Sequence, residues 1–496
     1  MNDKTKLGVR ILAAALGLGV LGDALLRVVP WGINATLWTA ALVAVVVLLA
    51  GRHAAFAGAG RWLLLPLLLF SVAFVWRDSP ALKMLNVLAL LVALALAVLR
   101  AQGGRILLAG IMEYIMGSLI AGLNAAVGLL PLLFGEMQWK EVLNNRVSGR
   151  ALAVLRGLVL ALPVLVIFGG LFVAADAVFE GMVRRVLHVN FATLFSHTFL
   201  TVFFAWIVAG FLRGMLMGRE RELATSWRPQ VFSLGIIETG IVLGLLDLLF
   251  LLFVLVQLRY LFGGAALVGV TPGLTYSEYA RRGFFELVAA AALVLPLLLL
   301  VHWLLRKENP VHERVFCGLA GVEILLLFVV MASALQRLRL YQSEYGLTEQ
   351  RVYPTAFLGW LAVVFVWFAL TVLRGRRERF AFGAMVAGYL LLAVLHFLNP
   401  DAFIARTNSA RVKAGRSFDA RYATWLSADA APELVSALPS LNPPDGCTVA
   451  ASILKRWPPS EKPDWRTWSW GRAEARRVVN ENAATLQAVA CREKKD

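Results

Sequence analysis

About eleven stretches of this chain are apolar over the length that a helix needs to cross a bilayer, and this repetition restricts its fold more than any other feature. A helix rises about 1.5 Å per residue, so about 20 apolar residues cross roughly 30 Å of hydrocarbon. We therefore expect an all-α fold, a polytopic bundle of about eleven transmembrane helices. The expected spans are residues 8–29, 33–50, 62–76, 82–99, 151–178, 191–212, 232–258, 283–304, 314–336, 354–373 and 380–398.

The charge distribution indicates the lipid bilayer as a partner and gives no support to nucleic-acid binding. Hydrophobic residues make up 59% of the chain and charged residues 16%, which is unlike a soluble globular domain. The formal net charge is +17. The Lys and Arg residues nevertheless lie singly or in small groups beside the apolar runs, as the positive-inside rule expects, and form no single basic patch. We expect no nucleic-acid partner.

Loop charges predict a cytoplasmic N-terminus and an extracytoplasmic C-terminal tail. Residues 106–134 are ambiguous, because this apolar stretch contains Glu113, Asn124 and four glycines. If the stretch lies along the interface, the loops assigned to the inside carry about twice as many Lys and Arg residues as those assigned to the outside. We therefore expect an interfacial helix at 106–134 that does not cross the membrane.

The chain divides into three parts by composition. Residues 1–150 hold four expected spans and the interfacial helix, and residues 151–398 hold seven spans. From residue 399 to residue 496 the sequence is charged and rich in proline, with no window that could cross a membrane. Helix-capping signals, such as Ser427 before Pro432, predict a small extracytoplasmic helical domain there.

Two of the three cysteines lie in the tail. Cys447 and Cys491 are on the side that the topology places outside the cytoplasm, where disulfides persist. A bridge between them would close a loop of about 45 residues and is a possible pairing, although two cysteines form no framework pattern. Cys317 lies in a span and is most simply a small packing residue.

Polar side chains inside the spans form the first candidate site. Glu238, Asp247 and Glu323 lie deep in apolar stretches, where a charge is costly unless it faces a partner or water. Asp247 shares a helix face with Gln257, whereas Glu238 points the opposite way. The four groups are interpreted either as a proton or ion relay, or as hydrogen-bonding groups that fix helix packing.

A second candidate site is expected on the outer face, where two loops mix Tyr, Arg and Glu residues. Arg side chains can bind phosphate or carboxylate groups, and Tyr rings can pack on sugars, so an anion or glycan pocket is one interpretation. An aromatic belt with flanking cations is the other. The residues are Tyr260, Glu278, Arg281, Arg282, Glu286, Arg337, Arg339, Tyr341, Tyr345, Arg351 and His396.

Strong catalytic signatures are absent from the sequence. It contains no Walker lysine loop, HExxH, paired CxxC or GxSxG motif, and its six histidines are scattered. We expect no metal site and no cofactor, and the sequence leaves open whether the protein is an enzyme.

Several segments, in order, resemble the bacterial multi-spanning family known as domain of unknown function 4173, which is allied to domain 4153. The likeness covers roughly residues 152–434, with Ala177 where the family often carries proline. The resemblance implies a multi-pass protein of the bacterial cytoplasmic (inner) membrane, and no activity. The segments are LPVLVIF with AADAVF (162–179), QLRYLFGG (257–264), TYSEYARRGFFEL (275–287), LYQSEYGLTEQRVY (340–353) and NPDAFIARTN with DARYATWLSADAAPEL (399–434).

Three classes of function are compatible with these features. The first is a membrane protein that handles an ion, solute or lipid of the cell envelope, which the deep carboxyl groups favour. The second is an envelope enzyme that acts on a lipid-linked substrate at the outer face. The third is a sensor or assembly factor that binds an envelope ligand or protein partner, not identified by the sequence, through its outer loops and tail.

Overall fold

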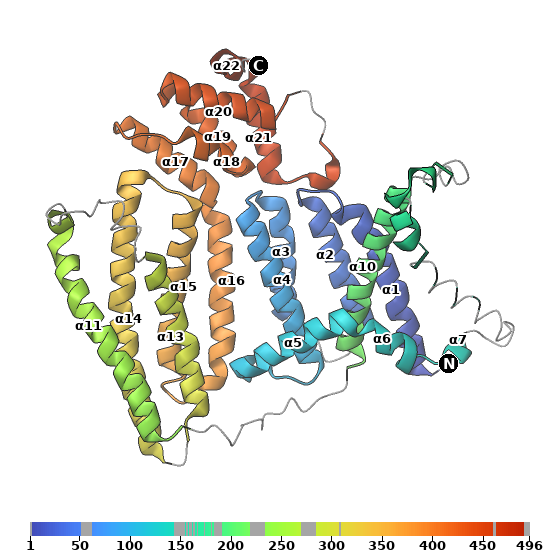
Figure 1. Ribbon diagram of the computed structural model, residues 1–496, viewed down its shortest axis with the longest axis horizontal. Helices are drawn as coiled ribbons and strands as arrows, with labels where there is room; N and C mark the ends of the chain where they lie inside the picture. The colour runs from blue at the N-terminus through green and yellow to red at the C-terminus, as the bar shows by residue number, and fades with distance from the viewer. Residues whose placement is uncertain are drawn as a thin grey trace.

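The computed structural model describes residues 2–50, 62–142, 191–218, 234–268, 284–306, 309–459 and 463–490, with scattered positions between 154 and 182. These ranges are helical, and the strand-type pairing in them is one isolated bridge between Leu234 and Leu305. Long helices stand side by side, and the tail forms a group of shorter helices at one end (Figure 1). For the described residues, the expected all-α fold is confirmed.

One group of long helices contains α1, the first helix of the chain. Helices α1 and α10 approach closely, because a Cβ atom added at Gly19 would lie 2.5 Å from the Thr201 carbonyl oxygen. Small residues at such contacts let helix backbones pack together in a membrane, where van der Waals contact drives association. The helices are α1 (Asp3–Leu26), α2 (Ile33–Ala50), α3 (Leu64–Trp76), α4 (Pro80–Ala101) and α10 (Phe191–Leu216).

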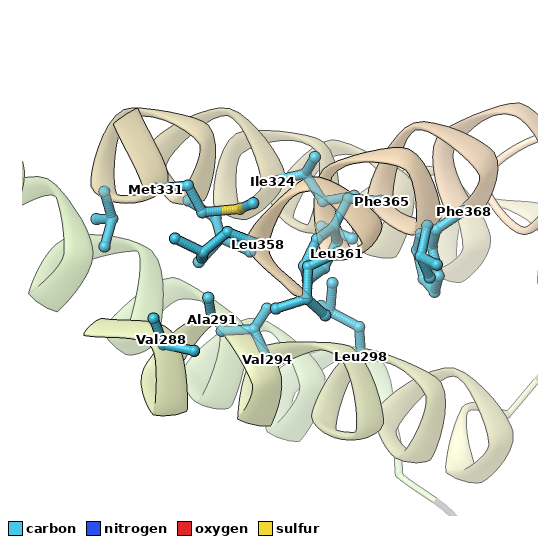
Figure 2. Close-up of a cluster of buried hydrophobic side chains, with 14 of the residues drawn as sticks. Val288, Ala291, Val294, Leu298, Ile324, Met331, Leu358, Leu361, Phe365 and Phe368 are labelled. Atoms are coloured by element: carbon cyan, nitrogen blue, oxygen red, sulfur yellow. The ribbon is translucent and has the colours of Figure 1, made fainter. Parts of the chain in front are cut away.

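A second group contains the largest buried apolar cluster. Figure 2 shows side chains of α13, such as Val294, meeting Ile324 of α14 and Leu361 of α15. Apolar residues recur every three or four positions on these helices, so one stripe of each faces the cluster. The helices are α11 (Ile236–Val268), α13 (Phe284–Leu304), α14 (Pro310–Tyr345), α15 (Glu349–Thr371) and α16 (Phe380–Leu398).

The segment expected to lie along the interface runs crosswise to the long helices (Figure 1). It forms α5 (Ile111–Val127) and α6 (Leu129–Pro131), followed by the turn Leu132–Glu136, and it bends by 56° between its two parts. Its start lies against Leu99 of α4, and its end contacts the beginning of α1 through Met137 and Gly8. Both ends of the segment are therefore at the end of the bundle where the chain begins.

The tail folds as a compact helical unit around its own buried cluster, which includes Ile404, Leu434 and Val449. Cys447 in this unit is disulfide-bonded, whereas Cys317 is a reduced thiol that donates to the Leu373 carbonyl oxygen. The expected partner, Cys491, lies outside the described residues, so the pairing stays a prediction. The helices are α17 (Pro400–Lys413), α18 (Ala420–Trp425), α19 (Ala431–Ala437), α20 (Pro443–Arg456), α21 (Trp470–Glu481) and α22 (Ala483–Val489).

The tail contacts three turns between long helices. Ile33 donates its backbone N–H to the Trp468 carbonyl oxygen at 2.8 Å, and the Asn408 side chain accepts from the backbone N–H of Leu347 at 2.7 Å. The third turn joins α3 to α4. The N-terminus lies at the opposite end of the bundle (Figure 1), an arrangement compatible with the expected N-in, C-out topology.

Eight helices among the described residues are long and apolar enough to cross a membrane, or nine if the bent pair α5 and α6 is one span. Helices α2 and α3 are apolar but shorter. The expected span at 151–178 lies mostly outside the described residues. The described helices are therefore those of a multi-pass membrane protein. The expected total of eleven spans stays a prediction.

Candidate functional site: a buried carboxyl pair and an outer polar network

Asp247 and Glu323 come together between α11 and α14. Asp247 lies on the face of α11 that packs on α14, where Val254 and Gln257 are also buried. Glu323 is fully buried on the facing side of α14. Asp247, Val254 and Gln257 of the expected stripe are buried, and the stripe faces a second acidic residue that the sequence could not identify as its neighbour.

The two carboxyl groups interact with each other and with no other polar group of the described residues. The side chains of Asp247 and Glu323 lie close enough for each to influence the charge of the other. All four oxygens are buried without a donor group from the rest of the described protein. Two ionised carboxylates in contact in a medium of low dielectric would repel strongly, so a proton shared between them is the stable arrangement.

A second polar contact joins the same two helices about ten residues further along each. Gln257 Oε1 accepts hydrogen bonds from Ser333 Oγ at 3.1 Å and from Arg337 Nη2 at 2.6 Å. The offset of 76 positions that relates Gln257 to Ser333 also relates Asp247 to Glu323, so α11 and α14 run parallel. Arg337, expected in the outer site, thus belongs to this intramembrane seam.

Glu238 lies apart from the carboxyl pair. It is exposed in the first turn of α11, beside Gly235. A carboxylate in this position is stabilised by the free backbone N–H groups of the helix start. Glu238 therefore has a local role at the start of α11, and the intramembrane set separates into a buried carboxyl pair, Gln257 further along α11, and Glu238 in the first turn.

The expected outer site is only partly described. Arg351 lies over the Tyr341 ring, 4.2 Å from its centroid, and the rings of Tyr341 and Tyr345 lie tilted to each other with their centroids 4.9 Å apart. Arg351 also donates to the carbonyl oxygens of Tyr345 and Gly346, so its guanidinium holds the turn between α14 and α15. The Tyr260 side chain and residues Glu278, Arg281 and Arg282 lie outside the described residues.

Other members of the outer set lie away from that turn. Glu286 is exposed on α13, and Arg339 is exposed on α14. His396 is buried, shares a 2.8 Å hydrogen bond through Nε2 with Asn86 Oδ1, and stacks on Trp76. The structure thus brings Tyr341, Tyr345 and Arg351 together, and it places His396 in a different network.

That second network lies where the tail meets the α3–α4 turn. Asp78 Oδ1 is 2.6 Å from Lys83 Nζ and 3.2 Å from Arg472 Nη1 of the tail. Asp429 Oδ2 accepts the backbone N–H groups of Asp78 at 2.7 Å and Ser79 at 3.1 Å. A buried ion pair of this kind fixes the relative placement of two parts more than it adds stability.

Two carboxyl groups of the network stay partly unsatisfied. Asp429 Oδ1 and Asp401 Oδ1 are buried without a hydrogen-bond partner. Burial raises the pKa of Asp429 to about 6, with Asp78 and Asp401 nearby as like charges. Burial also raises the pKa of Asp401 to about 6, and the neighbouring Glu349 adds to the shift.

Part of this network has a signal in the sequence, which a count of loop charges alone does not reveal. A count of loop Lys and Arg residues includes Arg77 and Lys83 only as charges, yet Lys83 sits on the helix face that continues to Asn86, three residues further on. A cation and an amide on one face of a span indicate a buried polar contact. Arg472, which pairs with Asp78, lies in the tail, and no local pattern links these two residues.

Comparison with known families adds one result. A family model described as "Domain of unknown function (DUF4153)" matches residues 64–437, which is most of the chain. The chain belongs to the DUF4153 family. No curated protein and no solved structure matches the chain.

The DUF4153 match refines the resemblance drawn from the motifs. It identifies the allied family, and membership of domain family 4173 stays a prediction. The DUF4153 region begins at residue 64, so it includes α3 and α4, for which the motifs implied nothing. It contains the carboxyl pair and, apart from Arg472, the ionic groups of the network where the tail meets the α3–α4 turn. In the described residues no group of three or more His, Cys, Asp or Glu side chains could hold a metal ion.

Proposed function

We propose that this protein handles an ion within the membrane, and that Asp247 and Glu323 bind and release a proton as part of that activity. The observation that supports this most is the contact between two buried carboxyl groups with no basic side chain of the described residues beside them. A carboxyl pair without a counter-cation changes its charge when it gains or loses a proton. This is the property that a proton relay or a proton-coupled transporter requires.

The location of the pair is compatible with a moving element. Helix α11 lies at the edge of the bundle (Figure 1), and much of its surface outside the stripe is exposed. Deprotonation would place two negative charges between α11 and α14 and so weaken their contact. Proton release and separation of the helices would then be coupled.

The alternative functions have less support. An envelope enzyme requires an outer pocket that joins the Tyr, Arg and Glu residues, whereas Arg351 uses its donors on its own turn and Glu286 is exposed on α13. A sensor or assembly factor would act through its outer loops and tail, and the buried polar groups of the tail contact the helix bundle itself. The cytoplasmic (inner) membrane of a bacterium is the proposed location, as the resemblance implied.

The test uses the full-length protein in liposomes that enclose a pH-sensitive dye. After a pH step, wild-type protein should transmit protons faster than empty liposomes, and Asp247→Asn and Glu323→Gln should each reduce this flux at least tenfold. Glu238→Gln is the matched control, because Glu238 is an exposed acid on the same helix, and it should retain the wild-type flux.

An infrared measurement covers the case in which flux also needs a co-transported solute. The wild-type protein should show a pH-dependent band of a protonated carboxyl group that shifts in Asp247→Asn and in Glu323→Gln and is lost in the double variant. A band that persists in the double variant, or flux that is unchanged in both single variants, would remove the proposal. The result would then favour the packing role of the pair.

A further inference from the structure

A crevice of about 830 Å³ opens at the end of the bundle where the chain begins. It lies among the start of α1, the end of α4, the crosswise helix α5 and the end of α10. One part of its wall is polar and the other apolar, so it matches a ligand with two such parts. The lining residues on which the argument depends are Lys4, Asn124, Glu136, Arg213, Ile120 and Leu123.

The polar part of the crevice carries one positive charge in excess. Arg213 donates through Nε to Glu136 at 3.1 Å and through Nη1 to Asn124 Oδ1 at 3.2 Å. The Glu136 carboxylate therefore neutralises Arg213, and the amide group of Asn124 remains a possible donor. No ion pair neutralises Lys4 within the described part of the chain. These groups favour an anion with several acceptor oxygens, such as a phosphate group.

The apolar part of the crevice continues into an exposed stripe of α5. Leu123 and Val127 line the crevice and are also exposed on the helix surface. Met112 and Met116 extend this surface along the same helix. A stripe of this kind on a helix that lies across the bundle is typical of insertion at the boundary between head groups and acyl chains. A ligand in the crevice thus has direct access to the acyl-chain region.

We propose that this crevice binds an anionic phospholipid of the adjacent leaflet. The phosphate lies near Lys4 and Asn124, and an acyl chain lies along Ile120, Leu123 and Val127. A zwitterionic phospholipid has the same apolar part but carries a choline cation that does not match the excess positive charge. Anionic head groups are attracted by about 1 kcal/mol per basic side chain near the surface, a factor of about five in affinity. The site is separate from the carboxyl pair and does not depend on its function.

The test measures lipid binding to the full-length protein by native mass spectrometry in mild detergent. Phosphatidylglycerol should bind at least fivefold more tightly than phosphatidylcholine. Lys4→Gln should weaken phosphatidylglycerol binding about fivefold, whereas Lys6→Gln should not, because Lys6 is exposed and pairs with Asp3 at 3.3 Å. Ile120→Trp should fill the crevice and weaken binding, and Leu119→Trp on the adjoining exposed position should not.

Two arms separate the possible outcomes. Glycerol phosphate in excess should leave phosphatidylglycerol bound. If it displaces the lipid, the site takes a soluble phosphate compound and the lipid proposal is wrong. Equal affinity for the two lipids, or equal weakening by Leu119→Trp and Ile120→Trp, would show general surface binding and overturn the proposal. Circular dichroism melting of each variant identifies any loss of folding, and the Lys4 and Ile120 variants test the site independently.

Discussion

Arg472 Nη1 lies 3.2 Å from Asp78 Oδ1, and this ion pair joins the tail to the turn between α3 and α4. Both side chains are only 7% exposed. Arg472 also donates to the carbonyl oxygens of Pro30 and Trp31, so one guanidinium contacts two turns of the membrane bundle. The placement of the tail on the bundle therefore depends on a few buried polar contacts.

Removal of one partner of this pair should be strongly destabilising. Arg472→Met leaves the Asp78 carboxylate buried with Lys83 as its remaining cation, and loss of a buried partner typically costs about 3 to 5 kcal/mol. Thermal unfolding in detergent should show a lower Tm for the variant, and protease should cut it between α16 and the tail. Arg477→Gln is the control on the same helix, because Arg477 forms exposed ion pairs, and its Tm should equal the wild-type value.

The docked tail should be more stable in mild acid than at neutral pH. The pKa values of Asp429 and Asp401 rise from 3.8 to about 6 in the folded protein. A raised carboxyl pKa means that the protonated form is favoured on folding. This contribution is complete below a pH of about 4 and is lost as the pH rises through about 6.

The measurement compares unfolding of the wild-type protein with Asp429→Asn between pH 4 and pH 8. Each shift of this size corresponds to about 2 to 3 kcal/mol at most. The wild-type protein should lose more stability over this range than the variant, which lacks one titrating group. An identical pH dependence of the two proteins would contradict the prediction.

Gly32 should not tolerate a larger side chain, because the tail passes directly over it. A Cβ atom at Gly32 would lie 2.2 Å from the Trp468 carbonyl oxygen, beside the hydrogen bond from Ile33. Gly32→Ala should therefore lower the free energy of unfolding by about 1 to 3 kcal/mol. Gly17→Ala in α1 is the control, since nothing lies within 4 Å of its Cβ position. Its Tm should be unchanged or higher, as alanine favours a helix.

Cys447 should be oxidised with Cys491. Mass spectrometry of a non-reduced digest should identify a peptide pair that contains both residues. By the loop-entropy estimate, a loop of about 45 residues contributes about 4 kcal/mol, so Cys447→Ser should lower the Tm of the tail clearly. Cys317→Ser should have a small effect, because Cys317 is not in a disulfide and a serine hydroxyl can also donate to the Leu373 carbonyl oxygen. A digest with both tail thiols alkylated would contradict the pairing.

The crosswise segment should begin and end on the same side of the membrane. Single cysteines at Ala101 and Gly135 should react with an impermeant thiol reagent from the side of the N-terminus. A phosphatase fused after Asp496 should be active, since the tail is expected outside the cytoplasm. Labelling of the two cysteines from opposite sides would make the segment a span and overturn the predicted topology.

The sequence determined the class of the protein and much of its local structure. Apolar runs of bilayer length require helices, since backbone groups in hydrocarbon must be bonded within their own segment. The stripe on α11 follows from a second rule, because helical periodicity alone places Asp247 and Gln257 on one face. Eight described helices have the length and composition of spans, whereas α2 and α3 are shorter. The helical tail was predicted from its capping signals.

Tertiary structure decided which polar groups meet. Asp247 and Glu323 lie 76 positions apart, and Asp78 and Arg472 lie in different parts of the chain, so no periodic pattern relates either pair. Side-chain contacts between helices depend on crossing, rotation and register, which local sequence does not encode. Arg337 shows the same limit, because its flanking residues suggested an outer site, whereas packing of α11 on α14 directs its guanidinium to Gln257.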